Sequence, residues 1–500
     1  MNDFDVIIIG SGLGGLLCGY ILSKEGKNVC ILEKNHQPGG CLQSFRRNGV
    51  DFDTGVHYIG ALDEGQVLNR YFRYFGLMNT IKFRKLDQNG FDIIAFDEEE
   101  YPMAMGFDNF TENLLPFFPS EKPALQNYVD ALQKISKAFP LYNLEVPKDH
   151  REDIYYNHSA SAFFNSFSAT NHKGLTGRHP LSDVLAGNNF LYAGNQGITP
   201  LYIAALINHS FISSAWRPVD GSVQISDRLA GQIRNAGGKL ITGREVSRIS
   251  IRNSSFHVTT KAGEQYSAHS LVSAIHPAQT FAMTDPSTLR KVFSRRIMKL
   301  KNTPSCFALF ITLKENSFPQ LNYNYYFHSD NSIWTASPVN AWPGSYMLYT
   351  PFASGNNKYA KSMVIMTVMN FNEVRIWERT SSGHRGQDYL DFKDQKTEIL
   401  LTLVEKKFPG LRSKINFLDS STPLTWRDHT GTPEGSMYGI QKDFNDPLKT
   451  TILPRTKIPN LYFTGQNINL HGVLGVTIGS VLTCGELIGL DTLIKKIRNA

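Results

Sequence analysis

The chain has 500 residues, 41% of them hydrophobic and 19% charged, with a formal net charge of +7 at pH 7. This composition is that of a globular protein with a sizeable core and two or three domains. The modest charge argues against nucleic acid as a partner. Five scattered cysteines without a CxxC pair argue against a disulfide framework or a zinc site.

A strand-like run over residues 5–9 leads through a glycine-rich turn into a run of helical spacing over residues 13–21. Gly10 permits a sharp turn, Gly12 lets backbone N–H groups approach a pyrophosphate, and Gly15 lets the helix pack on the strand. The helix start adds the positive end of its dipole. This order of elements predicts a dinucleotide-binding site.

A second strand, over residues 28–32, ends at Glu33, which is placed to accept hydrogen bonds from an adenosine ribose. The glycine pair at 39–40 suits another close approach of the backbone to phosphate. Cys41 follows, and we interpret it as a small residue near the cofactor rather than a reactive thiol. The predicted cofactor-binding residues of this region are Gly10, Ser11, Gly12, Gly14, Gly15, Glu33, Lys34, Gly39, Gly40 and Cys41.

The middle of the chain is rich in aromatic residues, and alternating patterns predict strands over residues 305–313 and 363–369. Its aromatic and Met side chains can line a tunnel for a polyene or fatty chain, or they can form plain core. Residues 316–357 are loop-like. The aromatic clusters are Phe117–Phe118, Tyr155–Tyr156, Phe163–Phe164 with Phe167, and Tyr323 with Tyr325, Tyr326 and Phe327.

Residues 289–301 hold six basic side chains and predict a short helix. Its apolar face consists of Leu289, Phe293, Ile297 and Leu300. The helix either lies on an anionic membrane surface as a peripheral contact or is a solvated connecting helix. No apolar run is long enough to span a membrane, and residues 2–5 lack the basic start of a signal peptide. We expect a cytoplasmic protein, peripheral at the inner face of the membrane.

Near the C-terminus, a predicted strand ends at Gly465 and a helix begins near Gly472. Gly475 and Gly479 lie on one face of this helix, which can therefore come close to a planar ring. The N-terminal N–H groups of the helix would favour negative charge on such a ring. Alternatively, it is a glycine-rich helix packed tightly on a sheet.

The run from Phe52 to Gly60, Phe-Asp-Thr-Gly-Val-His-Tyr-Ile-Gly, follows the glycine pair. Here the sequence resembles the superfamily of phytoene desaturases, carotenoid isomerases and retinol saturases, and residues 39–60 are most similar to the retinol saturases. Residues 460–480 are similar to the closing flavin motif of that superfamily. The resemblance implies an FAD cofactor. It adds Thr54, Gly55, Val246 through its backbone, Gly465, Gln466 and Val473 to the cofactor-binding residues.

The resemblance also implies an α/β fold, in which a glutathione-reductase-like, Rossmann-type FAD-binding domain is interleaved with an α+β substrate domain in amine-oxidase-like topology. Strands predicted over residues 246–251, 255–260 and 271–274 belong to the return of the FAD-binding domain. The expected FAD-binding segments are 1–84, 216–288 and 453–500. The expected substrate-domain segments are 85–215 and 289–452.

The implied activity is that of an FAD-dependent oxidoreductase on a carbon–carbon double bond of an apolar isoprenoid, polyene or lipid, with hydride transfer at flavin N5. A redox-neutral cis-trans isomerase using reduced FAD and a non-catalytic lipid-binding escort protein are the alternatives. No second strand-linked GxGxxG occurs. Electrons therefore come from the substrate, from a soluble reductant such as NAD(P)H that binds transiently, or from a partner.

Two histidines are candidate catalytic acids, because both titrate near working pH and lie in segments expected to meet near the flavin ring. They are His57 and His471, and for each a structural role in fixing a loop is the alternative. Tyr58 is a weaker candidate. Asp53 is expected to brace its loop rather than act as a base.

Overall fold

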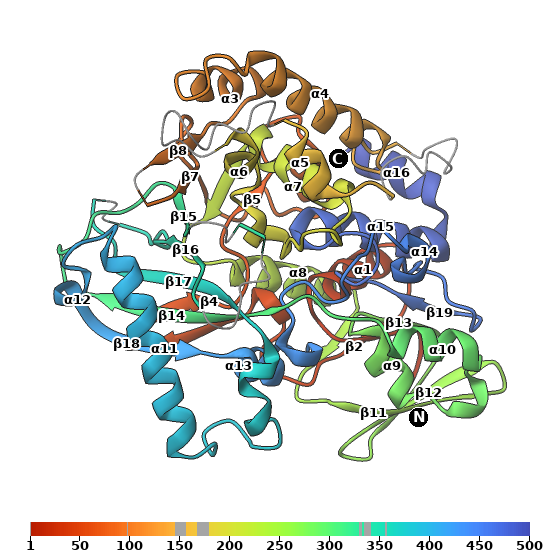
Figure 1. Cartoon of the computed structure of the whole chain (residues 1–500). Helices are drawn as coiled ribbons and strands as arrows, with labels where there is room; N and C mark the ends of the chain where they lie inside the picture. The colour runs from red at the N-terminus through yellow and green to blue at the C-terminus, as the bar shows by residue number, and fades with distance from the viewer. Residues whose placement is uncertain are drawn as a thin grey trace.

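The computed structural model describes residues 2–97, 99–145, 157–167, 180–329, 333–334, 342–355 and 358–500. Tyr155 and Tyr156 lie outside this described part. Two seven-stranded sheets lie beside each other, and helices between residues 107 and 213 gather at the top of the view (Figure 1).

The first sheet gathers strands from the beginning, middle and end of the chain: β1 (Asn2–Ile9), β2 (Val29–Leu32), β10 (Lys239–Ile241), β11 (Val246–Arg252), β12 (Ser255–Thr260), β13 (Gln265–Ser273) and β19 (Leu461–Phe463). The order is β10-β2-β1-β13-β12-β11, with β19 also paired to β13. The pairs from β10 to β13 and the β13–β19 pair are parallel. Along β1, Ile7 and Ile9 enter one core and Val6 and Ile8 the other, as the alternation of a strand requires.

Helices cover both faces of this sheet. One face carries α1 (Leu13–Lys24), α8 (Val223–Asn235) and α15 (Gly472–Ile488), and the other carries α9 (Pro277–Met283) and α10 (Lys291–Met298). Parallel strands with helices on both faces form the doubly wound arrangement that dinucleotide sites use. The strand, turn, helix and second strand predicted for the first 33 residues are thus confirmed.

The second sheet consists of β7 (Asp92–Ala95), β8 (Glu100–Met103), β14 (Ser305–Leu313), β15 (Asn324–His328), β16 (Ser345–Tyr349), β17 (Ser362–Met369) and β18 (Ile415–Ser421), in the order β18-β14-β17-β16-β15-β7-β8. The two strands predicted here, β14 and β17, are confirmed. The loop predicted over residues 316–357 is wrong, because β15 and β16 lie within it. Their short aromatic runs are buried in the sheet, and the Pro and Asn residues that suggested a loop flank them.

The remaining helices are α2 (Val67–Tyr74), α3 (Phe107–Leu114), α4 (Lys122–Ala138), α5 (Ala160–Asn165), α6 (Leu181–Ala186), α7 (Leu201–Ser213), α11 (Gln387–Glu405), α12 (Leu411–Lys414), α13 (Pro423–Thr430), α14 (Pro447–Thr450) and α16 (Leu490–Arg498). A hairpin of β3 (Ser44–Arg47) and β4 (Val50–Asp53) and a three-stranded sheet of β5 (Ile59–Gly60), β9 (Ala215–Pro218) and β6 (Phe83–Lys85) complete the fold. Within the described residues, no helix combines the length and the apolar character needed to cross a membrane.

Strands of the segments expected to bind FAD, 1–84, 216–288 and 453–500, share the first sheet, while β7, β8 and β14 to β18 come from the other two segments. The small three-stranded sheet lies at two of the expected boundaries, since β6 crosses 84/85 and β9, with which β5 and β6 pair, crosses 215/216. The boundaries between the two domains stay predictions.

Helix α10 is shorter than residues 289–301, and its apolar face points inward. Ile297 and Leu300 are 1% and 9% exposed, and Phe293 packs edge-on against Phe281 of α9 at 5.6 Å between ring centroids. This face belongs to the core under the first sheet. This face is covered by protein and is not free for a membrane, while a membrane contact through other side chains of residues 289–301 stays a prediction.

This packing predicts a contrast between two residues of α10. Replacing buried Ile297 by Ala should lower the free energy of unfolding by about 2–5 kcal/mol, since a cavity remains. Replacing exposed Val292 by Ala should change it by less than about 0.5 kcal/mol. Urea unfolding of both variants measures the difference. Equal destabilisation would contradict the inward orientation.

Candidate active site

A cavity of about 490 Å³ lies where the two sheets meet. Its wall combines segments that are far apart in the sequence: residues 9–14, 32–35, 39–42, 54–57, 244–246, 274–283, 426–438, 465–467 and 472–476 all contribute. The volume falls within the range of roughly 300–1,000 Å³ that is typical of ligand pockets. Sequence-predicted residues from both ends of the chain therefore meet in one cavity.

The turn between β1 and α1 has the geometry that its glycines predict. Gly10 has a φ of +93°, a conformation that residues with side chains rarely adopt. A Cβ on Gly15 would lie 2.0 Å from the carbonyl oxygen of Gly10, so this glycine allows α1 to contact β1. A Cβ on Gly12 would meet no atom within 4 Å. Gly12 thus borders open space, where a phosphate can approach the backbone.

Glu33 is 6% exposed and is held in place by the same turn. Its Oε2 accepts hydrogen bonds from Ser11 N at 2.8 Å and from Ser11 Oγ at 2.7 Å, and its Oε1 accepts one from Asn35 N at 2.9 Å. An ionised carboxylate has about four acceptor sites. The Glu33 carboxylate, which accepts three hydrogen bonds within the protein, can therefore accept another from a ribose hydroxyl. Ser11 itself does not line the cavity and acts through Glu33.

The two ends of the chain touch across the nucleotide turn. A Cβ on Gly14 would lie 2.8 Å from Gly465 Cα, and a Cβ on Gly40 would lie 3.0 Å from Gly12 Cα. Gly39 forms a bridge with Gly12. Side chains at these positions would force the three segments apart.

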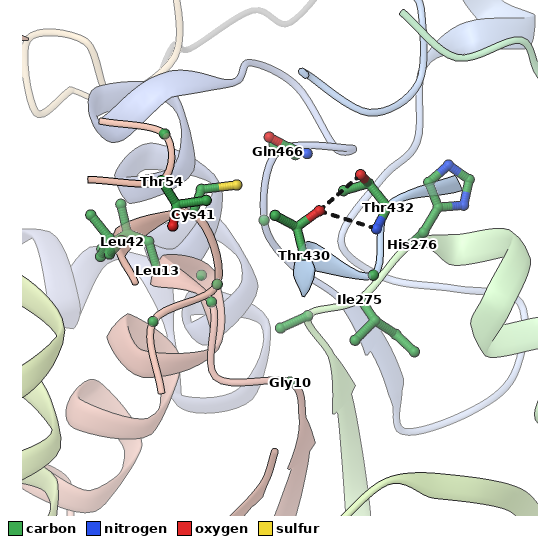
Figure 2. Close-up of a pocket in the computed structure, with 18 of the residues that line it drawn as sticks. Gly10, Leu13, Cys41, Leu42, Thr54, Ile275, His276, Thr430, Thr432 and Gln466 are labelled. Atoms are coloured by element: carbon green, nitrogen blue, oxygen red, sulfur yellow. Dashed lines mark hydrogen bonds between the residues drawn. The ribbon is translucent and has the colours of Figure 1, made fainter. Parts of the chain in front are cut away.

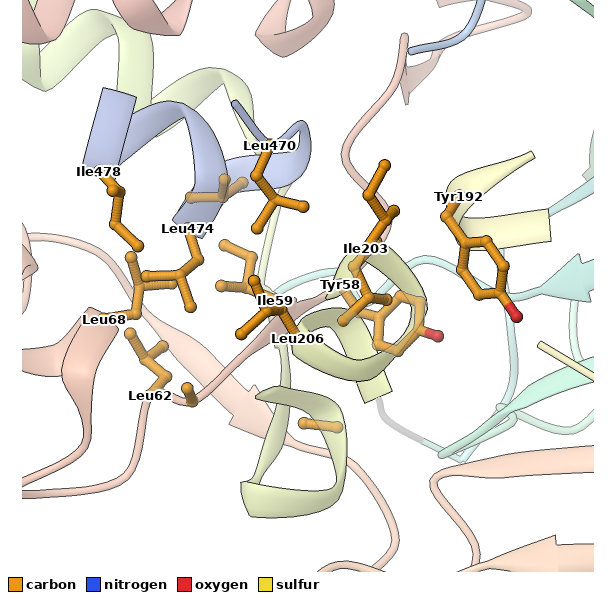
Figure 3. Packing of buried hydrophobic residues seen from close by; sticks show 14 of the residues in the cluster. Tyr58, Ile59, Leu62, Leu68, Tyr192, Ile203, Leu206, Leu470, Leu474 and Ile478 are labelled. Atoms are coloured by element: carbon orange, nitrogen blue, oxygen red, sulfur yellow. The ribbon is translucent and has the colours of Figure 1, made fainter. Parts of the chain in front are cut away.

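Helix α15 meets the cavity through Gly472, Val473 and Val476. Gly475 and Gly479 themselves do not line the cavity, and the close approach of this helix to a flavin ring stays a prediction. A Cβ on Gly475 would lie 2.7 Å from Leu470, so this glycine serves the packing of its own entry loop. Figure 3 shows Leu470, Leu474 and Ile478 packed against buried residues of β5 and α7, which fixes the helix start at the cavity.

The wall opposite the nucleotide turn, over residues 426–438, was not predicted to be part of the site. Figure 2 shows Thr430 and Thr432 on this wall, facing Gln466 and the turn at Gly10. Trp426 Nε1 and Ser436 Oγ are buried, and the described residues supply no hydrogen-bond partner for either. Both residues line the cavity. The three glycines of 431–439 were the available sequence signal.

The cavity wall can be compared with the parts of a flavin dinucleotide, because each part needs a different kind of neighbour. The glycine cradle at residues 10–15 and 39–40 leaves open backbone next to Glu33, as a pyrophosphate and a ribose require. Buried polar atoms are normally hydrogen-bonded, so the unpartnered atoms of Trp426 and Ser436 are suited to a polar ligand. Apolar side chains, among them Phe190 and Met366, form the rest of the wall. The residues that line the cavity therefore fit a flavin dinucleotide.

His57 lines this cavity, and its ring is fixed from behind. Nδ1 of His57 and the hydroxyl of Tyr349 are hydrogen-bonded at 2.7 Å. Arg217 Nε donates to the His57 carbonyl oxygen at 3.1 Å. Burial and the neighbouring Arg217 guanidinium lower the pKa of His57 to about 3. At neutral pH His57 is therefore an uncharged hydrogen-bonding group.

Arg217 is the centre of a buried polar network that the sequence did not reveal. It is 2% exposed and donates to Thr350 O at 2.8 Å and to Asn324 Oδ1. Asn324 in turn donates to Asp92 Oδ1 at 2.7 Å. Burial raises the pKa of Asp92 to about 7, even though hydrogen bonds and Arg217 oppose this shift. The network anchors the loop of His57 to the second sheet.

The loop of residues 53–58 has further anchors. Asp53 Oδ1 accepts hydrogen bonds from Ser222 N at 2.8 Å and from Ser222 Oγ at 2.9 Å, so Asp53 braces the loop as expected. Burial raises its pKa to about 6. The Tyr58 hydroxyl donates to Asp92 Oδ2 at 2.9 Å and lies inside the network. Neither side chain lines the cavity.

Of two other predicted residues, Cys41 lies in the cavity wall and His471 does not. Cys41 lines the cavity, and burial raises its thiol pKa to about 11, which fits a packing role. His471 lies outside the cavity wall. Its ring stacks on Tyr438 with 4.2 Å between centroids, and its Nε2 is 3.1 Å from Leu191 O. His471 therefore supports Tyr438, which lines the cavity, and a catalytic role for His471 stays a prediction.

A dinucleotide cradle that continues into an apolar chamber is the arrangement of a flavin-dependent oxidoreductase. Comparison with known proteins agrees with this class. The chain belongs to the flavin containing amine oxidoreductase family, whose pattern matches residues 13–483.

Relatives and solved structures extend this result. The chain is 26% identical to the all-trans-retinol 13,14-reductase of Rattus norvegicus over 97% of its own length and 86% of the relative, and 27% identical to that of Homo sapiens over 100% and 87%. It is 23% identical to prolycopene isomerase 2 of an Oncidium hybrid over 98% and 84%. A putrescine oxidase variant shares the fold with a TM-score of 0.65, 13% identity and 100% coverage of both chains. A fatty acid isomerase from P. acnes shares it with a TM-score of 0.59, 14% identity and coverage of 95% and 97%.

The two glycines of the turn predict separable defects. Gly12→Ala should leave the unfolding of the flavin-free protein unchanged but weaken flavin binding, because the added methyl group occupies the approach of the phosphate. Gly15→Ala should destabilise even the flavin-free protein, because its Cβ collides with backbone.

Thermal unfolding without flavin and flavin titration by fluorescence measure both effects. The assignment of the two glycines fails if Gly12→Ala binds flavin as wild type does, or if Gly15→Ala unfolds at the wild-type temperature.

Proposed function

We propose that this protein is an FAD-dependent oxidoreductase that adds hydrogen to a carbon–carbon double bond of an apolar isoprenoid or polyene. The observation that carries the proposal is a single cavity, which runs from the dinucleotide cradle at Gly12 to an apolar wall containing Phe190, Cys306 and Met366. The full-length similarity to retinol 13,14-reductases supports a double bond as the reacting group.

The chain's own residues would position the cofactor and the substrate, keep water out of the cavity and set its charge. The cradle and Glu33 hold the dinucleotide, while the buried side chains of the apolar wall exclude water and align a long apolar ligand. When bound, the flavin would supply a hydride from its N5 to one carbon of the double bond, and water or an acid would supply the proton that the other carbon takes up. His57, fixed by Tyr349 and neutral, presents its remaining ring nitrogen as a hydrogen-bonding group beside the ligand.

Electrons would reach the flavin from a soluble reductant that binds transiently, with NAD(P)H as the first candidate. The chain has one strand-linked glycine fingerprint, at Gly10 to Gly15, and the dinucleotide that this fingerprint holds is the resident cofactor. Comparing NADH, NADPH and dithionite as reductants under anaerobic conditions tests this part of the proposal.

A redox-neutral cis-trans isomerase is the second candidate, because the similarity to prolycopene isomerase also spans 98% of the chain. An escort protein without flavin is disfavoured by the complete cradle of Gly10, Gly12, Gly15, Glu33 and Gly40. Purified protein that contains no flavin and takes none up would favour the escort function.

His57 generates a pH prediction. Because the pKa of His57 is lowered to about 3, its imidazole is uncharged between about pH 5 and 8. The dependence of turnover on pH should therefore show no ionisation of His57 in this range. His57→Phe should lower turnover by about 100-fold, and His57→Gln should retain more activity because Gln keeps a donor. An ionisation near pH 6–7 that is lost in His57→Gln would show instead that a charged His57 acts as the acid.

Product mass tests the reaction. The reduced protein is incubated without oxygen with a panel of retinoids, carotenoids and unsaturated lipids, and the products are weighed by mass spectrometry. A gain of two hydrogens supports the proposal. Loss of two hydrogens with oxidised protein would overturn it in favour of desaturation, and a product of unchanged mass formed only with reduced flavin would favour isomerisation.

A further inference from the structure

Exposed apolar side chains gather at one place on the described surface. Val292 and Met298 of α10 are 85% and 54% exposed, and Leu448 and Leu453, at and just after α14, are 85% and 66% exposed. These are four of the eight large hydrophobic side chains that are exposed in the described part of the chain. Single exposed apolar residues are ordinary, but a cluster of them indicates a contact surface.

The two segments form one surface because Arg296 ties them together. Its Nη1 donates to the carbonyl oxygens of Leu448 at 2.8 Å and of Lys449 at 2.9 Å. Helices α10 and α14 lie on the same side of the molecule, at the right of Figure 1. We call residues 289–301 and 446–457 together the basic-apolar surface.

The charge of this surface is strongly one-sided. The two segments contain nine basic residues and one acidic residue, Asp446, whereas the whole chain has a net charge of only +7. Arg455 is paired with Glu486 at 2.6 Å. Arg290, Lys291, Arg295, Lys299, Lys301, Lys449 and Lys457 are exposed.

We propose that the basic-apolar surface docks this protein on an anionic lipid bilayer, with Val292, Met298, Leu448 and Leu453 inserted among the headgroups and the Lys and Arg side chains paired with lipid phosphates. Charge complementarity favours this occupant, since a juxtamembrane Lys or Arg contributes about a fivefold gain in affinity for an anionic leaflet. Leu, Val and Met insert into the interface. A nucleic-acid site would instead combine basic residues with exposed aromatic rings.

The surface is connected to the cavity on its inner side. The Lys442 ammonium, buried under the surface, donates to Thr450 O at 3.0 Å and to Asn467 O at 2.9 Å, and Asn467 lines the cavity. Helix α9, against which α10 packs, also lines it, through Gln279, Ala282 and Met283. Docking would thus hold the cavity next to the phase in which an apolar substrate dissolves. Only this last step rests on the proposed function.

The test is co-sedimentation of the flavin-loaded protein with vesicles. At about 0.1 M salt, we expect binding to vesicles of phosphatidylcholine with roughly one third phosphatidylglycerol and at least tenfold weaker binding to phosphatidylcholine alone. The variant Val292→Asp/Leu448→Asp and the variant Lys291→Glu/Lys449→Glu should each bind the anionic vesicles at least tenfold more weakly than wild type.

Ile376→Asp/Leu390→Asp is the matched control, because Ile376 and Leu390 are 79% and 48% exposed and lie outside the surface. It should bind as wild type does. Flavin content and thermal unfolding should be unchanged in all three variants, since every altered side chain is exposed. This measurement involves no turnover, so its failure leaves the proposed function standing, and an inactive protein that binds vesicles leaves the docking surface standing.

Three results would overturn the docking proposal. They are absence of binding by wild type, equal binding to both kinds of vesicle, and unimpaired binding by both surface variants. If wild type dimerises in sedimentation velocity, ignores vesicles, and Val292→Asp/Leu448→Asp is monomeric, the surface is an interface between two copies of the chain instead.

Discussion

The structure depends on a backbone-to-backbone contact that only glycine permits. The nucleotide turn at Gly14 meets the C-terminal segment at Gly465 with no room for a Cβ, and Gly40 meets Gly12 in the same way. These contacts bring three segments, at Gly12–Gly14, Gly40 and Gly465, to the carboxyl ends of the parallel strands. In doubly wound folds, ligands bind at that end. The cavity exists because the glycines let these segments come together.

A second constraint is the burial of Arg217, which lies beside His57 on the side of the cavity formed with the second sheet. Buried charges are tolerated when they are paired and hydrogen-bonded. Arg217 meets this condition through carbonyl oxygens and through Asn324, which in turn binds Asp92. The network fixes the backbone of His57, and burial together with the Arg217 charge keeps the His57 imidazole uncharged. A neutral, rigid and largely apolar chamber suits a double bond better than a charged ligand.

The N-terminal site could be predicted from the sequence because its glycines, strand and acidic residue are contiguous, and a local pattern specifies a local turn. The cavity wall at Trp426 to Tyr438 could not, since its role depends on α13, which the second sheet holds opposite the nucleotide turn through β14 and β18. Arg217 was missed for the same reason. Gly475 shows a different limit of the sequence: a glycine on a helix face signals close packing, but the sequence does not name the neighbour, which for Gly475 is Leu470.

We propose that a flavin bound in this cavity exchanges electrons with a carbon–carbon double bond. Anaerobic stopped-flow absorbance tests it most directly, by mixing photoreduced protein with each apolar polyene of a panel. We expect the visible band of oxidised flavin to return with at least one of them, in step with one equivalent of substrate gaining two hydrogens. A flavin that stays reduced with every polyene, or that reoxidises without any change in substrate mass, would contradict it.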